Sequence, residues 1–239
     1  LIESSGTRVY QKPIHRGAML ETYHDGTQEV VGTVFVDDCQ WDRSAEYVTL
    51  LGAFKRDVTN GEIHVTGIGT KNLGALKPKL DQFGDGCIEL VTTVNTGRTV
   101  MVVFCWDGVV GASGYNNNGY SVALLGGQGY NNFRIQKRVN DVGTTLASAI
   151  ISYTETNPHR IIVVKSGSTI TASVYTIDGT LIKTITSTDN TYTEGYCGIF
   201  NHSAGSKYHR YQIIAASPDA SNGIAACIPP IGGGARYGV

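Results

Sequence analysis

The sequence predicts an all-β fold in which two antiparallel sheets pack face to face, and three observations carry this prediction. Short runs of alternating apolar and polar residues recur along most of the chain, separated by Gly, Asn and Asp turns. The chain has 30 Gly, only 6 Pro and 16% charged residues, a composition that suits strands and tight turns. No segment carries the apolar spacing of an amphipathic helix. The apolar faces of the strands must therefore be buried against a second sheet.

The clearest strand pattern lies in the C-terminal third of the chain. Residues 161–165 and 169–175 form a predicted hairpin around the turn Ser166-Gly167-Ser168. The dipeptide Asp178-Gly179 marks the next turn, because Asp-Gly favours tight hairpin loops. Further strands are expected at 180–186, 195–200 and 208–213.

The same pattern extends through the earlier part of the chain. In residues 132–139, Phe133 and Ile135 share one face of a predicted strand and leave the other face polar. The polar and basic residues of this run are interpreted as charge that protects a sheet edge: Arg134, Gln136, Lys137 and Arg138. Residues 67–84 are expected to be irregular, since Pro78 disfavours a helix there. Other strands are expected at 30–36, 47–51, 62–66, 86–94, 98–106, 120–125 and 143–148.

These patterns divide the chain into one body with two extensions. Residues 1–32 are expected to form an N-terminal arm or linker, and residues 33–216 to form the sandwich. Residues 217–239 contain Ile228-Pro-Pro-Ile231 and three consecutive Gly, and are expected to form a C-terminal tail suited to subunit contacts. The chain begins at Leu1 without a signal-like segment, so both processing and a preceding part stay open.

The overall composition disfavours several functional classes. A formal net charge of −1 gives no general attraction to nucleic acid or to an anionic membrane. No apolar run approaches the roughly 20 residues that a membrane-spanning helix needs. Five cysteines occur without a Cys-x-x-Cys pair, and most are expected to be small buried side chains, although a disulfide between two of them stays open. They are Cys39, Cys87, Cys105, Cys197 and Cys227.

The order of these segments resembles a known family. The resemblance rests on Gly84–Leu90, Tyr120–Leu125, Asn132–Lys137, His159–Val164, Ser173–Gly179 and Gly195–Phe200. Over residues 35–216 the chain resembles the concanavalin A-like lectin/glucanase superfamily, particularly its laminin-G-like branch. The resemblance implies a two-sheet antiparallel jelly-roll β-sandwich. It leaves the function open, because this sandwich hosts lectins, glycosidases, adhesion modules and virion proteins.

The Asn/Thr/Gly-rich turns and the two extensions also resemble phage tail or head appendages. This likeness implies a virion or extracellular location. The partners it implies are other virion or surface-assembly subunits, with the chain as a homo-oligomer or part of a larger assembly.

Glycosidases of the superfamily carry carboxylates at alternating positions of one strand, so that an acid and a nucleophile flank the scissile bond. The nearest match here is Asp81, Asp85 and Glu89. Only Glu89 lies in a predicted strand, where it alternates away from Ile88 and Leu90 and is expected to face solvent. No Gly-x-Ser-x-Gly elbow occurs. We therefore expect no catalytic residue and no enzymatic activity.

Two Gly-Tyr-Asn-Asn repeats, at 114–118 and 129–132, are the most lectin-like feature. An aromatic face can stack on a sugar ring, and Asn amides can bond its hydroxyls. The alternative is that Asn and Gly form tight turns while Tyr caps the sheet. One strand separates the repeats, so they should lie at opposite ends of the sandwich. The first is preferred, and its candidate glycan-binding residues are Trp106, Tyr115, Asn116, Asn117, Asn118 and Tyr120.

No cofactor is expected, with calcium as the alternative because many relatives use it. The formal calcium candidates are Asp37, Asp38, Asp107 and Asp178, and Asp beside Gly is also ordinary turn chemistry. His202 and His209 could meet across a loop, although ordinary surface or core histidines explain them as well.

The sequence thus favours a non-catalytic, lectin-like structural or adhesion module that could bind glycan. Two alternatives stay open. A glycoside hydrolase or lyase would require clustered carboxylates on the concave face. A purely structural assembly domain would use its two extensions to contact neighbours.

Overall fold

The computed structural model describes residues 9–10, 16–22, 28–37, 39, 44–65, 73–78, 83–95, 97–126, 132–202 and 206–216. Within these ranges the chain forms seventeen strands and one 3-10 turn, η1 (Ser44–Glu46), and no α-helix. Every strand pairing is antiparallel, which confirms the predicted fold class. In the same ranges no helix has the length and apolarity needed to cross a membrane.

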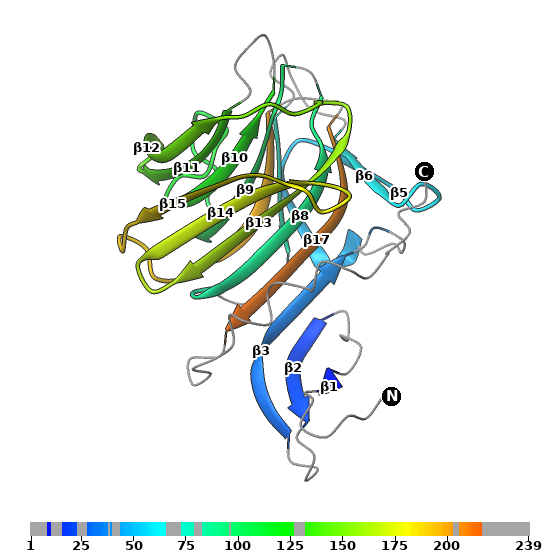
Figure 1. Ribbon diagram of the computed structural model, residues 1–239, viewed down its shortest axis with the longest axis vertical. Helices are drawn as coiled ribbons and strands as arrows, with labels where there is room; N and C mark the ends of the chain where they lie inside the picture. The colour runs from blue at the N-terminus through cyan, green and yellow to red at the C-terminus, as the bar shows by residue number, and fades with distance from the viewer. Residues whose placement is uncertain are drawn as a thin grey trace.

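The first sheet has ten strands, most of them visible side by side in Figure 1. Its main path runs through β1 (Val9–Tyr10), β2 (Arg16–Thr22), β3 (Gln28–Asp37), β17 (Lys207–Ala216), β8 (Gly86–Thr93), β13 (Pro158–Ser166), β14 (Thr169–Thr176) and β15 (Leu181–Thr188). The hairpin of β5 (Phe54–Asp57) and β6 (Glu62–Val65) joins this sheet through β17.

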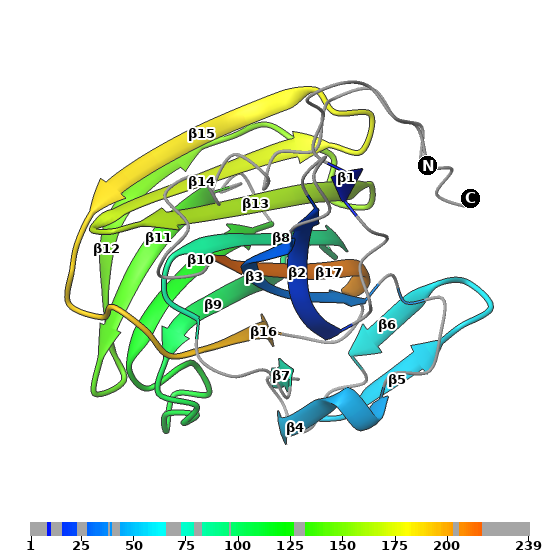
Figure 2. The same cartoon turned by 90° about the horizontal axis from the view of Figure 1, so that it is seen from below.

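The second sheet has seven strands. Its order is β12 (Val142–Ile150), β11 (Asn132–Val139), β10 (Gly119–Leu125), β9 (Thr99–Trp106), β16 (Tyr196–His202), β7 (Leu73–Pro78) and β4 (Tyr47–Leu51). The two sheets face each other (Figure 2).

The core fills the space between the sheets. On β10, Tyr120, Val122 and Leu124 point into this core, whereas Ala123 belongs to a separate apolar cluster on the opposite face. Leu90 and Val163, on neighbouring strands of the ten-stranded sheet, meet the core from the other side and are fully buried. Period-two alternation therefore gives each sheet an inner face toward the core and an outer face away from it.

Two expectations about the strands need revision. Strand β11 lies between β10 and β12, so its basic residues do not protect an edge, and that interpretation was wrong. Strand β7 lies in the segment 67–84 that was expected to be irregular. Pro78 is tolerated there because it is the last residue of the strand.

The expected boundary between residues 32 and 33 falls inside β3, and β2 pairs with β3. The division of the chain into arm, sandwich and tail stays a prediction. Residues 217–239 lie outside the described part of the chain.

A bulge in β9 changes the face on which its last residue lies. Cys105 has a φ of 46°, and the pairing with β16 shifts so that Tyr196 faces Trp106 and Gly198 faces Val103. Cys105 belongs to the core, whereas Trp106 belongs to the apolar cluster on the opposite face of the sheet. Bulges commonly redirect side chains in this way. Glycine at 119 and 195 permits the close approach, because a Cβ there would lie 2.8 Å from the Cys105 carbonyl oxygen or 2.5 Å from the Trp106 nitrogen.

Candidate functional site

The loop between β9 and β10, residues 107–118, folds back on itself. The Gly111 and Asn117 amides donate to the carbonyls of Tyr115 and Val109, at 2.7 and 3.0 Å. The Asp141 amide, in the β11–β12 turn, donates to the Asn117 carbonyl at 2.9 Å, which ties the two loops together. Val110 and Tyr115 pack on an apolar cluster on the outer face of the seven-stranded sheet. Its buried members are Ala75, Met101, Val103, Trp106, Ala123 and Phe200.

Two predicted sugar-stacking rings are buried. Trp106 is 0% exposed, packs edge-on against Phe200 with centroids 5.1 Å apart, and donates from Nε1 to the Val109 carbonyl at 2.7 Å. Tyr120 is also 0% exposed and points into the core, where its hydroxyl donates to Asp189 Oδ1 at 2.6 Å. Neither ring offers a free face to a ligand in this structure.

Asn117 and Asn118 brace the loop. Both side-chain amides donate to Asp107 Oδ2, at 3.1 and 2.9 Å. The Asn118 Oδ1 atom accepts from the Asn140 amide at 2.8 Å and from the Tyr192 hydroxyl at 3.3 Å. These contacts match the turn-forming alternative for this repeat. The second repeat lies largely outside the described residues, which resume at Asn132.

Tyr115 and Asn116 differ from the rest of the predicted set. Tyr115 is partly buried, and the Arg138 guanidinium lies 4.8 Å from its ring centroid. Burial raises the pKa of its hydroxyl, while Arg134 and Arg138 act in the opposite direction. Asn116 is 1% exposed, and neither polar atom of its side chain has a hydrogen-bond partner among the described residues. The Ser121 hydroxyl is buried on the outer face in the same condition.

Two arginines project from the outer face of β11. Arg138 is held by Asp141, with a 2.9 Å contact to Oδ1, and it also donates to the Ser113 hydroxyl at 3.0 Å. The hydrogen bond from the Ser113 hydroxyl lowers the pKa of Asp141, with Arg138 contributing further. Arg134 has no hydrogen bond or ion pair in the described part of the chain, and its Nε is buried without an acceptor.

We name Tyr115, Asn116, Ser121, Arg134 and Arg138 the outer-face cluster. Among the described residues it combines a partly exposed ring, an arginine without a carboxylate partner, and five buried polar atoms without hydrogen-bond partners. Sequence reasoning missed Ser121 and misinterpreted the two arginines. The strand predicted at 143–148 could have corrected the interpretation of the arginines. It follows residues 132–139 as their hairpin partner, so residues 132–139 form an interior strand of the sheet.

The carboxylates compared with those of glycosidases form ion pairs wherever they are described. Glu89 lies on the outer face of the ten-stranded sheet but is only 5% exposed, so the expectation that it faces solvent was wrong. Arg160 from β13 contacts it at 3.1 Å, and Arg210 from β17 lies 3.9 Å away, so both side chains shield it. Asp85 binds Lys165 Nζ at 2.9 Å. Asp81 lies outside the described residues.

Three of the four calcium candidates, Asp37, Asp107 and Asp178, are described, and each accepts hydrogen bonds from the protein. Asp37 is fully buried and forms a bidentate pair with Arg56, at 3.0 and 2.6 Å. Asp178 accepts from the Thr180 amide in an exposed turn, and Asp38 lies outside the description. In the described ranges no group of three or more His, Cys, Asp or Glu residues could hold a metal ion. The four described cysteines, Cys39, Cys87, Cys105 and Cys197, are not in disulfides.

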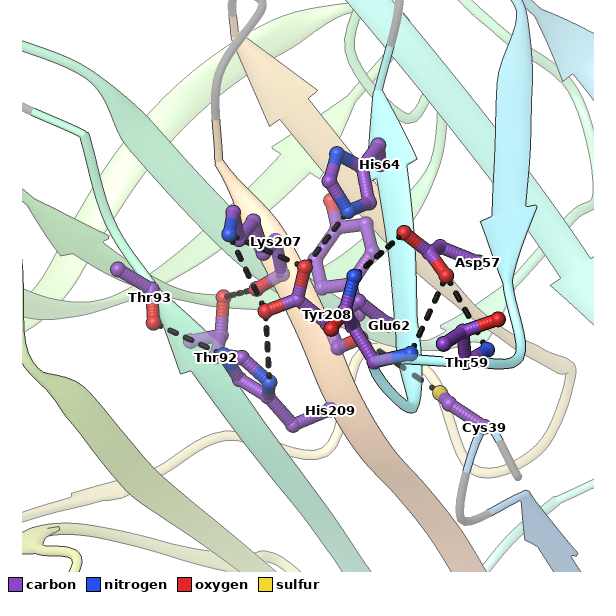
Figure 3. Close-up of polar contacts among 11 residues, drawn as sticks. Cys39, Asp57, Thr59, Glu62, His64, Thr92, Thr93, Lys207, Tyr208 and His209 are labelled. Carbon is purple, nitrogen blue, oxygen red and sulfur yellow. Dashed lines mark hydrogen bonds and ion pairs between the residues drawn. The ribbon is translucent and has the colours of Figure 1, made fainter. Parts of the chain in front are cut away.

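A second polar cluster attaches the β5–β6 hairpin to β17 (Figure 3). At its centre, Glu62 lies 2.7 Å from His64 Nε2, 3.0 Å from Lys207 Nζ and 3.8 Å from His209 Nδ1. His209 Nε2 is in turn 2.8 Å from the Thr93 hydroxyl on β8. Burial would raise the pKa of Glu62, but hydrogen bonds from Lys207 and His64 outweigh it and lower that pKa. The side chain of His202 is not described, so its expected proximity to His209 stays a prediction.

Replacing Glu62 with Gln is expected to loosen this hairpin without unfolding the sandwich. The hairpin pairs with β17 at only two positions, Lys207–His64 and Tyr208–Ile63. The variant should lower the free energy of local opening by about 1 kcal/mol, since the partners are partly solvent-exposed. Amide exchange at Ile63 and His64 measures this opening. Glu194→Gln, at an exposed carboxylate, is the control, and equal exchange in both variants would contradict the assignment.

Acidification is expected to destabilise the protein through its buried histidines. Burial lowers the pKa of His159 below its ordinary 6.5, and Nδ1 donates to the Asn157 carbonyl at 2.8 Å. Burial also lowers the pKa of His209. In the unfolded chain these imidazoles take up protons near pH 6.5, whereas in the folded chain burial keeps them neutral to a lower pH. Their contribution to the free energy of unfolding is therefore present above pH 6.5 and is lost as the pH falls through the folded pKa. Melting temperatures between pH 7.5 and pH 5 should decline less steeply in His159→Gln; identical slopes would refute the role of His159.

Comparison with known proteins identifies no family model and no curated protein that matches this sequence. Solved structures do match. The carbohydrate-binding module CBM66 from Bacillus subtilis is 14% identical with a TM-score of 0.51, covering 72% of this chain and 92% of its own. The exoplasmic/lumenal domain of VIP36, in a Ca2+/Man2-bound form, is 13% identical with a TM-score of 0.60, covering 79% and 91%. Lectin UEA-II complexed with galactose is 8% identical with a TM-score of 0.59, covering 77% and 98%.

At these identities the likeness concerns the fold alone. The structural alignments cover almost all of each matched protein and most of this chain. The chain therefore has the fold expected from its sequence, a two-sheet antiparallel jelly-roll sandwich similar to those of these lectin-like structures.

Proposed function

We propose that this chain is a non-catalytic carbohydrate-binding module that holds glycan at the outer-face cluster. One observation carries the proposal: a partly exposed Tyr115 ring lies among polar groups that have no hydrogen-bond partner in the described part of the chain. Burying such a group unsatisfied costs about 1–3 kcal/mol. Sugar rings have both an apolar face that stacks on an aromatic ring and hydroxyls that donate and accept hydrogen bonds.

The fold comparison supports the same proposal. The similar structures include a carbohydrate-binding module, a lectin complexed with galactose and a domain bound to Ca2+ and Man2. Because VIP36 is described with calcium, a calcium requirement is part of what must be tested. The glycan assays should therefore be run with added Ca2+ and with a chelator.

The test is a glycan array with purified protein, followed by titration of the best ligand. Tyr115→Ala is expected to weaken binding about tenfold, because it removes the stacking surface. Tyr175→Ala is the matched control: Tyr175 is also partly buried and lies 6.0 Å from an arginine, Arg160, but it belongs to the opposite sheet. No binding at millimolar sugar, or equal losses in both variants, would refute the proposal. Turnover of a polysaccharide would refute its non-catalytic part and favour the glycoside hydrolase or lyase.

A second candidate, a structural assembly domain without ligand, is favoured by β12, which forms one edge of the seven-stranded sheet in the described part of the chain. Strand β12 has no charged side chain, and Val142 and Ile150 are 69% and 80% exposed. Uncharged, exposed edges invite pairing with another chain. The mass of the protein in solution tests this: an oligomer that Val142→Lys dissociates would support it, and a monomer at high concentration would oppose it. The virion or extracellular location and the surface-assembly partners stay predictions.

A further inference from the structure

We infer that the ligand of the outer-face cluster is an acidic saccharide whose carboxylate or sulfate is bound by Arg134. This inference rests on the proposed function and names its substrate class. It starts from a cation whose position no structural role explains.

Arg134 does not protect a sheet edge. Its strand, β11, is paired on both sides, and Arg134 itself lies opposite Ala123 of β10 and Ser148 of β12. Its neighbours Phe133 and Ile135 point into the core, so Arg134 projects from the outer face. An interior strand has no exposed ladder to protect, and a small or polar residue would serve the outer face equally well.

Arg134 also lacks the counter-ion that comparable arginines have. Among the partly buried arginines whose side chains are described, Arg56 binds Asp37, Arg138 binds Asp141, and Arg160 and Arg210 share Glu89. Arg134 has no carboxylate partner in the described ranges. The charges of Arg138 and Asp141 offset each other, so the cluster keeps one uncompensated positive charge.

The surroundings of Arg134 make an anion the fitting partner. Burial, together with the charge of Arg138, lowers the pKa of Arg134, so the charged form is already penalised there. A guanidinium binds a carboxylate or sulfate through two parallel hydrogen bonds. Ser121 lies on β10 opposite Gln136, next to the Ala123–Arg134 pair, and its buried hydroxyl has no hydrogen-bond partner among the described residues. The Tyr115 ring, which lies close enough for Arg134 to influence its ionisation, supplies the apolar contact for the sugar.

The experiment compares matched neutral and acidic sugars by calorimetric titration of the full chain. The pairs are galactan with galacturonan fragments, lactose with sialyllactose, and lactose with sulfated lactose. We expect the acidic member of at least one pair to bind about 10–100-fold more tightly, the range for a charge-assisted hydrogen bond. The uronate and sialate arms report a carboxylate, and the sulfated arm reports a sulfate ester. Affinity should fall between 50 and 300 mM salt.

Three variants assign the effect to this side chain. Arg134→Gln should abolish the preference for the acidic sugar, so that the two members of a pair bind with equal affinity, and Arg134→Lys should retain part of the preference. Arg98→Gln removes the same charge from an exposed position and should behave as the wild type. Because the Arg134 guanidinium makes no hydrogen bond among the described residues, its loss should leave the melting temperature unchanged.

Each contrary outcome is distinct. Equal binding of neutral and acidic sugars would overturn the acidic class and leave the proposed function standing. Equal losses of affinity for the acidic sugar in Arg134→Gln and Arg98→Gln would overturn the role of Arg134, because they would show a general electrostatic effect. Inorganic sulfate that binds as tightly as the sulfated sugar would overturn the claim that the ligand is a saccharide. Failure of every sugar to bind would overturn both this inference and the proposed function.

Discussion

Replacing Asp37 with Ala is expected to lower the free energy of unfolding by about 3–5 kcal/mol, the range for breaking a buried ion pair. The side chains of Asp37 and Arg56 are only 0% and 7% exposed, and two hydrogen bonds join them. Asp37 also accepts from the Tyr47 hydroxyl at 2.9 Å and from the Cys39 amide at 2.8 Å. The variant would leave the buried Arg56 guanidinium without its carboxylate partner. It would also remove the acceptor of the Tyr47 hydroxyl and the Cys39 amide.

Urea denaturation of wild type and variant measures this loss. Glu194→Ala, at an exposed carboxylate, is the control and should change stability by less than about 0.5 kcal/mol. The double variant Asp37→Leu/Arg56→Met should recover much of the loss, because an apolar pair can replace a buried ion pair at little cost. A loss below about 1 kcal/mol in Asp37→Ala would show that water reaches the pair.

Replacing Trp106 with Ala is expected to destabilise the protein by about 3–5 kcal/mol, the usual cost of truncating a buried tryptophan. The indole fills the outer-face apolar cluster against Phe200, and its Nε1 satisfies the Val109 carbonyl. The variant would leave a cavity under the β9–β10 loop and a carbonyl without a donor.

Denaturation and glycan titration of the same variants separate the two roles considered for Trp106. Trp106→Phe should lose less stability than Trp106→Ala, because the Phe ring fills part of the cavity, although the hydrogen bond to the Val109 carbonyl is lost in both variants. Tyr115→Ala is the comparison at a partly exposed ring and should affect binding more than stability. A Trp106→Ala protein that keeps its stability but loses sugar binding would contradict the structure and restore the predicted stacking role.

Much of the fold could be predicted because local patterns specify it. The hairpin of β13 and β14 follows directly from alternation around a short turn, with Ser166 paired to Thr169. The faces of β11 were also predicted, since Phe133 and Ile135 do point into the core. Alternation likewise places Tyr120 on the same face as Val122 and Leu124, so its burial could have been predicted from the sequence.

The rest depends on contacts between distant segments. Trp106 reaches the outer face only because Cys105 adopts a left-handed conformation. No local sequence pattern predicted this bulge in β9. The exposure of Glu89 was mispredicted because Arg160 and Arg210 shield it from strands far along the chain. Whether Arg134 has a counter-ion depends on the same long-range placement. Alternation predicts the face of a side chain, but only the folded neighbourhood determines what covers it.

The exposed turn of the β5–β6 hairpin has a consequence for how the molecule responds to proteases. The hairpin projects from one side of the sandwich (Figures 1 and 2), and its turn, Val58–Asn60, is exposed. Sub-global opening at such an element precedes loss of the main sheets. A brief digestion should therefore nick the backbone at this turn first and leave two fragments that still migrate as one folded particle.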